Sequence, residues 1–277
     1  MTLIAAREAA LGTRLRDEAG SCRFYRSTYI GSDAGAHGVV AALAQVPADS
    51  LTPYPVAYQI ELDPFSDLDV HFHRANQFQV FVQGNGTLGR HAVQAVTVHY
   101  AGAHTAYGPI RPGAQGLTFI TMRDAWDPGA RFLPLHRDEL RLARVARREA
   151  LASPLASADP AHLLALPQAT CEPLLSSDDD ALAVWSLRLP PGAVFEAPSN
   201  LQSGGQFWLV LAGALQGPTG EWLGPLSCLH LGADELAAPV KATSEGLHLL
   251  VLRLPRRLTP IACTRAADAV PVQARGG

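Results

Sequence analysis

The sequence is short of several features that mark particular classes of protein. Lys241 is its only lysine and its net charge is −3, so it has no general basic surface for nucleic acid or an anionic membrane. Its hydrophobic runs are too short to form a membrane-spanning helix. Segment 1–20 mixes acidic and apolar residues, which predicts a short amphipathic helix and not a signal peptide. We therefore expect a cytoplasmic protein that binds neither nucleic acid nor membrane.

Cysteine is also scarce. The four cysteines, Cys22, Cys171, Cys228 and Cys263, are far apart and form no Cys-x-x-Cys pair. A chain of 277 residues that is 48% hydrophobic buries a substantial core without a disulfide framework. We expect reduced thiols in a soluble globular protein of one large or two smaller domains.

Short apolar runs separated by turn residues dominate the chain, which has 24 glycines and 21 prolines. Examples are VAYQIEL (56–62), QFQVFVQG (77–84), GLTFITMR (116–123), QFWLVLAG (206–213) and GLHLLVLR (246–253). Short β-rich runs divided in this way predict an all-β sandwich or barrel.

These runs form two sets in the same order, which indicates an internal duplication. Run 77–84 aligns with 206–213 at an offset of 129, and run 116–123 aligns with 246–253 at an offset of 130. Between them, VHYAGAH (98–104) aligns with CLHLGAD (228–234), also at 130. One inserted residue reconciles the offsets, so each half is expected to be one small barrel.

The duplication predicts the domain boundaries. We expect an N-terminal barrel over 1–136 and a C-terminal barrel over 171–277. The linker, 137–170, begins with RDELRLARVARREA (137–150), a charged segment that predicts a solvated or interdomain helix.

Two histidines, His71 and His73, stand just before the run at 77–84. Side chains alternate along a strand, so both project from the same face. Inside a barrel two imidazoles need partners, and a pair at i and i+2 converges well on one transition-metal ion. The alternative interpretation is an exposed pair, or a pair hydrogen-bonded to the backbone.

The spacing around these histidines resembles the first motif of the cupin family, which is His-x-His, three or four residues, Glu, six residues and Gly. His71, His73, Gln77 and Gly84 match this motif, with glutamine in place of glutamate. The resemblance covers about 55–125 and, more weakly, about 185–253. It implies an all-β bicupin: two double-stranded β-helix barrels of jelly-roll type with short flanking helices.

A second cupin motif supplies a third histidine after a glycine turn. Gly102 and His104 lie about where it is expected, although the Pro-x-Gly entry is absent and Gly108 stands in place of the family's Asn. His99 lies five residues before His104, on the opposite face of a continuous strand, but a bulge could exchange the two.

The resemblance implies one divalent metal ion, Fe, Zn, Ni or Mn, held by His71, His73, His104 and Gln77. A glutamine ligand is neutral and weaker than a carboxylate, and Gln77 could instead hydrogen-bond to another ligand.

Four further side chains are candidates for a substrate pocket. Gln79 and Phe81 share a face with Gln77, Tyr58 lies on the run at 56–62, and Tyr107 follows His104. Ordinary packing is the alternative for each of them.

The second half lacks the histidines. By the offset, the counterparts of His71, His73, Gln77, Gln79 and His104 are Asn200, Gln202, Gln206, Trp208 and Asp234. Transition-metal binding is not expected there, and the indole of Trp208 would fill the space of a substrate. The competing interpretation is a metal-free pocket lined by Asn200, Gln202 and Asp234.

The resemblance leaves several functions open, because cupins support many reactions. The leading hypothesis is a metal-dependent enzyme acting on a small organic substrate, a dioxygenase or a related lyase or isomerase. The alternatives are a non-catalytic small-molecule binder or sensor, and a metal-free isomerase that uses His71 or His73 as a general base. The resemblance also implies a homodimer.

Overall fold

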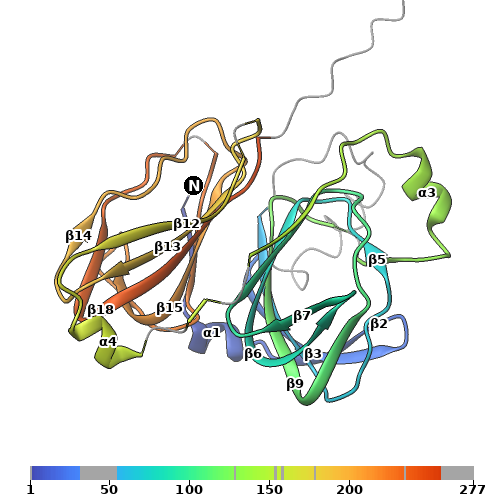
Figure 1. Cartoon of the computed structure of the whole chain (residues 1–277), viewed down its shortest axis with the longest axis horizontal. Helices are drawn as coiled ribbons and strands as arrows, with labels where there is room; N and C mark the ends of the chain where they lie inside the picture. The colour runs from blue at the N-terminus through green and yellow to red at the C-terminus, as the bar shows by residue number, and fades with distance from the viewer. Residues whose placement is uncertain are drawn as a thin grey trace, which may run out of the picture.

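The computed structural model describes residues 2–31, 55–127, 129–152, 155–156, 159–177, 179–233 and 235–256. The chain is all-β, with two large sheets that form two jelly-roll barrels side by side (Figure 1). The fold class predicted from the sequence is therefore confirmed. Asp234 and Cys263 lie outside the described residues.

The N-terminal barrel is built on an eight-stranded antiparallel sheet in the order β11-β8-β6-β9-β4-β3-β2, with β7 paired to β6. Its strands are β2 (Leu15–Ala19), β3 (Cys22–Ile30), β4 (Val56–Leu62), β6 (Gln77–Leu88), β7 (His91–Gln94), β8 (Thr97–Ala101), β9 (Ile110–Arg123) and β11 (Glu149–Ala152). A separate two-stranded sheet pairs β5 (His71–Phe72) with β10 (Arg131–Phe132).

The C-terminal barrel has a second eight-stranded sheet in the order β1-β17-β15-β18-β13-β12, with β14 and β16 paired to β18 and β15. Its strands are β1 (Leu3–Ala5), β12 (Thr170–Ser176), β13 (Ala183–Leu189), β14 (Val194–Phe195), β15 (Gln206–Gln216), β16 (Trp222–Leu223), β17 (Cys228–Leu231) and β18 (Val240–Arg253). The helices in the described part of the chain are α1 (Arg7–Leu11), α3 (Arg137–Leu142) and α4 (Pro160–Leu164).

The strand registers confirm the duplication. In the first barrel Gln77 pairs with Arg123, and in the second Gln206 pairs with Arg253. The long strands β9 and β18 have the same length and start 130 residues apart. Positions matched by the sequence offset are therefore structurally equivalent, and the two barrels can be compared residue by residue.

A pair of glycines holds the same bend in both barrels. Gly84 has φ 79° and Gly213 has φ 69°, values that residues with a side chain rarely adopt. A Cβ at Gly84 would lie 2.2 Å from the carbonyl oxygen of Gly116, and one at Gly213 would lie 2.1 Å from that of Gly246. These close approaches explain why both aligned runs end in glycine.

Two short strands cross the expected chain boundaries. β1, at the start of the chain, pairs with β17 of the C-terminal sheet. β11, inside the predicted linker, pairs with β8 of the N-terminal sheet. The division of the chain into barrels at 1–136 and 171–277 with a linker at 137–170 stays a prediction. Each of the two sheets has one edge strand from outside the range predicted for its barrel.

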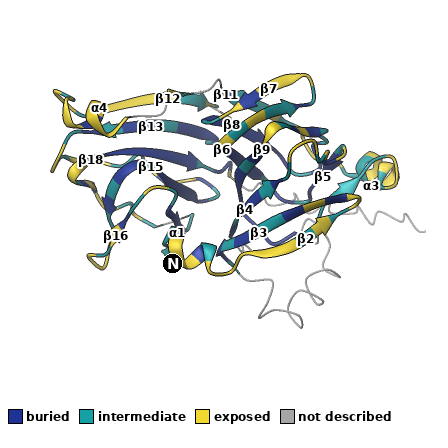
Figure 2. Cartoon of the chain, turned by 90° about the horizontal axis from the view of Figure 1, so that it is seen from below, coloured by how far each residue is buried: buried dark blue, intermediate teal, exposed yellow. Residues whose placement is uncertain are grey.

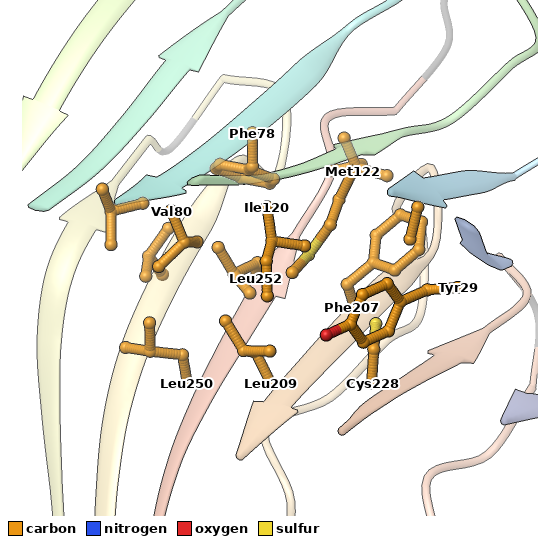
Figure 3. Close-up of a cluster of buried hydrophobic side chains, with 14 of the residues drawn as sticks. Tyr29, Phe78, Val80, Ile120, Met122, Phe207, Leu209, Cys228, Leu250 and Leu252 are labelled. Carbon is orange, nitrogen blue, oxygen red and sulfur yellow. The ribbon is translucent and has the colours of Figure 1, made fainter. Parts of the chain in front are cut away.

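A shared hydrophobic core joins the barrels. Side chains on β6 alternate, so Phe78 and Val80 point out of the first barrel and meet Phe207 and Leu209 of the second (Figure 3). Both faces of the central strands are therefore buried, as Figure 2 shows for β6 and β15, while β12 and β2 expose many residues. This double burial explains why β15 is apolar at successive positions from 207 to 212, whereas β6 keeps the buried glutamines Gln77 and Gln79 on its inward face.

No helix in the described part of the chain is long and apolar enough to span a membrane. Among the described cysteines, Cys22, Cys171 and Cys228 are free thiols. The helix predicted over 137–150 forms only from Arg137 to Leu142.

Candidate functional site

Strand β5 presents its side chains alternately to the inside and the outside of the first barrel. The rings of His71 and His73 lie 5.2 Å apart, and Phe72 between them is fully buried on the other side. The backbone of His71 exchanges two hydrogen bonds with the backbone of Tyr107. This bridge brings the phenol ring of Tyr107 to 4.6 Å from the imidazole of His71.

The hydrogen bonds of His71 determine its tautomer. Its Nδ1 lies 2.6 Å from the backbone oxygen of Asp69, which can only accept, so Nδ1 carries the proton. Its Nε2 is then an acceptor, and the hydroxyl of Tyr107 donates a hydrogen bond to it over 2.9 Å. Both ring nitrogens of His71 are therefore hydrogen-bonded to other groups of the protein.

His73 is held in the same way by charged groups. Its Nδ1 donates to the Oδ1 atom of Asp127 over 2.8 Å, so its Nε2 accepts from a guanidinium nitrogen of Arg123 over 2.9 Å. Asp127 also accepts from the backbone N–H groups of Arg74 and Gly129. Because its side chain is fully buried, this carboxylate needs all of these donors.

Gln77 connects the two imidazoles. Its amide oxygen accepts from Nε of Arg123 over 2.9 Å, and its amide nitrogen donates to the hydroxyl of Tyr107 over 2.5 Å. The hydrogen bonds therefore form a chain in which Arg123 donates to Gln77, Gln77 donates to Tyr107, and Tyr107 donates to His71. With the branch from Arg123 through His73 to Asp127, the cluster is one continuous hydrogen-bond network.

Burial sets the charges of this cluster. Burial lowers the pKa of His71 to about 3, and the nearby His73 and Arg123 add to the effect. Burial and the charge of Arg123 also lower the pKa of His73, and burial raises the pKa of Tyr107. Burial alone would raise the pKa of Asp127, but its bonds from His73 and its proximity to Arg123 lower it. At neutral pH the histidines and Tyr107 are uncharged, while Arg123 and Asp127 form an ionised pair.

A cavity of about 470 Å³ opens above this cluster, inside the first barrel. The cluster supplies one polar part of its lining, the floor, and Asp17, Glu18 and Arg26 supply a second polar part, while much of the remaining wall is apolar. The apolar lining includes Phe24, Ile60, Phe119, Trp126 and Phe132. The volume and the mixed lining are typical of a small-molecule site.

Three of the four predicted pocket residues line this cavity: Tyr58, Gln79 and Tyr107. The ring of Tyr58 also lies 5.3 Å from the guanidinium carbon of Arg123. Phe81 instead packs in the barrel core, where its ring lies 5.4 Å from that of Phe119. The expectation that Phe81 forms a cavity wall is corrected accordingly: it supports the wall from behind.

His104 does not join His71 and His73. Its backbone has φ 56°, in the left-handed region, and its ring lies beside Phe72, with 5.7 Å between centroids. Since Phe72 points away from the two inner histidines, His104 lies on the outer side of β5. The predicted set of His71, His73, His104 and Gln77 is therefore divided between the two sides of that strand.

His99 takes the inward position instead. Its ring is fully buried and lies 5.0 Å from that of Tyr107. It is hydrogen-bonded to Gln79 over 2.9 Å and to Glu149 over 3.1 Å. Its inward direction follows from the register of β8 against β6, in which His99 lies opposite the inward-facing Gln79. His99 and His104 thus lie on opposite sides, as their spacing of five residues predicts, but it is His99 that faces inward.

Arg123 and Asp127 were missed by the sequence reasoning. A signal for Arg123 was present, because the aligned runs GLTFITMR and GLHLLVLR both end in arginine. Asp127 lies beyond the end of β9, where strand periodicity no longer indicates which way a side chain points.

The second barrel is filled at the equivalent place. Trp208, the counterpart of Gln79, is buried in the core, and its indole N–H donates to Gln206 over 3.0 Å. Asn200 is held by the backbone oxygen of Gly232 and the hydroxyl of Ser203, and Gln202 is exposed. Asn200 is therefore hydrogen-bonded within its own barrel and Gln202 faces solvent, while Asp234, the third residue of the alternative pocket, lies outside the described residues.

As arranged, the donors of the first barrel do not fit a divalent metal ion. Each neutral imidazole has one lone pair, and those of His71 and His73 are already used by Tyr107 and Arg123. Gln77 offers an amide oxygen that also accepts from Arg123. Among the described residues, no group of three or more His, Cys, Asp and Glu side chains is placed to hold a metal.

No protein-family model matches the chain, and no curated protein matches its sequence. Several solved structures share its fold. A proposed dioxygenase from Nostoc punctiforme is 13% identical with a TM-score of 0.52, over 95% of this chain and 81% of that one. The bacterial pirin YhhW from Escherichia coli, in complex with nickel(II), is 11% identical with a TM-score of 0.52, over 92% and 100%.

An oxalate decarboxylase from Lactobacillus farciminis, in a formate complex, is also similar to the chain. It is 11% identical with a TM-score of 0.52, over 91% of this chain and 86% of that one. Identities this low show a common fold and carry no residue-level function. The similarity extends over both barrels, so the whole two-barrel architecture is shared.

Proposed function

Because the chain has the two-barrel fold of the cupin superfamily, we propose that its N-terminal barrel binds a small organic molecule. The observation that carries this proposal is the cavity of about 470 Å³, which has a polar floor and apolar walls. Polar atoms of His71, Tyr107 and Arg123 meet at the floor, while aromatic rings line the sides. Such a cavity orients a ligand through a few polar contacts and binds it by burying its apolar surface.

The chemistry of the floor favours a ligand with an acceptor or anionic group at one end. Arg123, whose positive charge is balanced in part by Asp127, lies beside the neutral His71 and His73. Arg26 lies elsewhere on the cavity wall and forms an ion pair with Asp17 over 2.7 Å. A small organic acid with an apolar or aromatic body matches both parts of the cavity.

The two barrels of this chain provide the experiment. Gln79→Trp introduces into the first barrel the residue that fills the same position of the second, so the fold is expected to tolerate it. The probe is 1-anilinonaphthalene-8-sulfonate, an aromatic anion whose fluorescence rises in apolar cavities. We expect saturable binding to the wild type and a loss of at least tenfold in affinity in Gln79→Trp.

The control is Gln83→Trp, because Gln83 lies on the same strand β6 but is exposed. It should bind the probe as the wild type does. Equal binding by the wild type and Gln79→Trp would show that the cavity is not the site. A panel of small carboxylic acids competing with the probe then identifies the ligand class.

A metal-dependent enzyme of dioxygenase type is the second candidate. The outer nitrogens of His71 and His73 are fixed by a backbone carbonyl and a carboxylate, an arrangement that also orients metal-ligating histidines. Similar folds occur in a nickel-bound pirin and an oxalate decarboxylase. This function requires Arg123 and Tyr107 to leave both imidazoles. Elemental analysis tests it: stoichiometric Fe, Zn, Ni or Mn, lost in a His71→Ala/His73→Ala double variant, would favour it.

A further inference from the structure

We infer that the guanidinium of Arg123 takes the place of a metal ion in the first barrel and excludes divalent cations from it. The inference concerns this arginine alone and stands apart from the ligand proposed above. It rests on the hydrogen bonds of His73 and Gln77, in which Arg123 is the donor and the two expected metal ligands are the acceptors.

The first step is the lone pair of His73. Its Nδ1–H is committed to Asp127, so the only free electron pair is on Nε2. A guanidinium nitrogen of Arg123 lies 2.9 Å from that atom. A zinc-like ion would have to lie about 2.0–2.1 Å from the same nitrogen, along the same direction. The ion and the guanidinium cannot both occupy this space.

The second step is that Arg123 engages a second expected ligand at the same time. Its Nε donates to the amide oxygen of Gln77 over 2.9 Å. That oxygen is the atom with which a glutamine would coordinate a metal. Arg123 thus covers two of the predicted ligands with two donors, and its position is supported by Asp127, whose Oδ1 lies 3.8 Å away.

The third step is charge. Arg123 lies in the buried floor and remains protonated, so a divalent cation beside it would meet a positive charge at short range. The fully buried Asp127 already balances this charge and is occupied by His73, Arg74 and Gly129.

The second barrel shows that the arginine is part of the repeated scaffold. Arg253 occupies the equivalent strand position, but its guanidinium donates to the backbone oxygens of Ala181 and Ser199. No histidine corresponds to His71 or His73 there. Arg253 is therefore a matched control, because it is the same residue in the same register, with Asn200 and Gln202 in place of His71 and His73.

The test is a gain of metal binding on removal of the arginine. Cobalt(II) alone is titrated into purified wild-type protein and the Arg123→Ala, Arg123→Met and Arg253→Ala variants, and bound metal is followed by its visible absorption. We expect both Arg123 variants to bind cobalt(II) at least tenfold more tightly than the wild type and Arg253→Ala. Adding His73→Ala to Arg123→Ala should abolish the gain.

Circular dichroism establishes that each variant is folded, and Arg123→Met retains most of the side-chain volume if the alanine variant does not fold. Nuclear magnetic resonance of the imidazole nitrogens of the wild type gives a measurement without substitution. In excess zinc(II), the His73 Nε2 signal should stay unchanged. A zinc-induced shift of this signal, or folded Arg123 variants with wild-type cobalt affinity, would overturn the inference. Neither result alters the anilinonaphthalene sulfonate test of the cavity, so the two proposals fail separately.

Discussion

The two barrels of this chain share their strand order and register but differ in what fills them. In the first, a polar network lies under a cavity. In the second, the same level of the barrel is closed by Trp208 and aliphatic side chains. The exchange of Gln79 for Trp208 lies at the centre of this difference. The scaffold therefore does not require either interior, and the residues facing inward from β6 and β15 decide between a site and a core.

The outward faces show the opposite behaviour, because they are similar in the two barrels. Phe78 and Phe207 are equivalent positions, and both lie in the core that joins the barrels (Figure 3). The side chains that face inward differ between the barrels, lining a cavity in one and filling a core in the other, while those that face outward pack in the same shared core. The following variants test how far this division extends.

The largest effect is expected at the shared core. Phe78→Ala and Phe207→Ala each remove a fully buried ring, which should cost about 3–5 kcal/mol of unfolding free energy. Because both rings serve one interface, both substitutions should shift the same urea unfolding transition, followed by circular dichroism. Phe65→Ala, at an exposed phenylalanine, is the control and should change stability by less than about 0.5 kcal/mol. Separate transitions affected by different variants would show that the barrels unfold independently.

The next effect concerns the repeated bend. Gly84→Ala and Gly213→Ala each place a Cβ against a backbone carbonyl and force a left-handed φ on alanine. We expect a loss of roughly 2–4 kcal/mol in each, because strain and overpacking add together. Gly224→Ala, which meets no atom within 4 Å, is the control. If thermal denaturation gives clearly unequal losses for Gly84→Ala and Gly213→Ala, the two bends are not equivalent.

The smallest of the three effects is a pH dependence specific to the second barrel. Burial lowers the pKa of His248 to about 4, and its Nε2 lies 2.9 Å from the hydroxyl of Ser186. The stability that a neutral His248 provides is complete above about pH 6.5 and is lost as the pH falls toward 4. Between pH 7 and pH 4, the free energy of unfolding of His248→Gln should therefore fall by about 2–3 kcal/mol less than that of the wild type.

Urea denaturation at several pH values measures this difference. The same replacement at the exposed His91 is the control and should leave the pH profile unchanged. Thr118 occupies the equivalent position of the first barrel and does not titrate in this range. A His248→Gln variant that loses stability in parallel with the wild type would contradict the expectation.

Much of this architecture could be predicted because periodicity and glycine positions survive in the sequence. The aligned runs predicted the duplication, and alternation placed His71 and His73 on one face. Alternation could not tell which of His99 and His104 faces inward, because that depends on the register of β8 against β6, which places His99 opposite Gln79. The role of Arg123 could not be predicted, since a long flexible side chain can reach in several directions, as its counterpart Arg253 shows.

The edge strands tie the C-terminal sheet to the start of the chain through β1 and the N-terminal sheet to the linker through β11. A protein cut within 137–170 would separate β1 from β17, and a cut before Glu149 would also take β11 away from β8. Either fragment would expose unpaired backbone and the apolar surface that now faces its neighbour, both of which promote aggregation. The C-terminal barrel therefore covers the apolar outer face of the barrel that contains the cavity, and its removal is expected to destabilise that barrel.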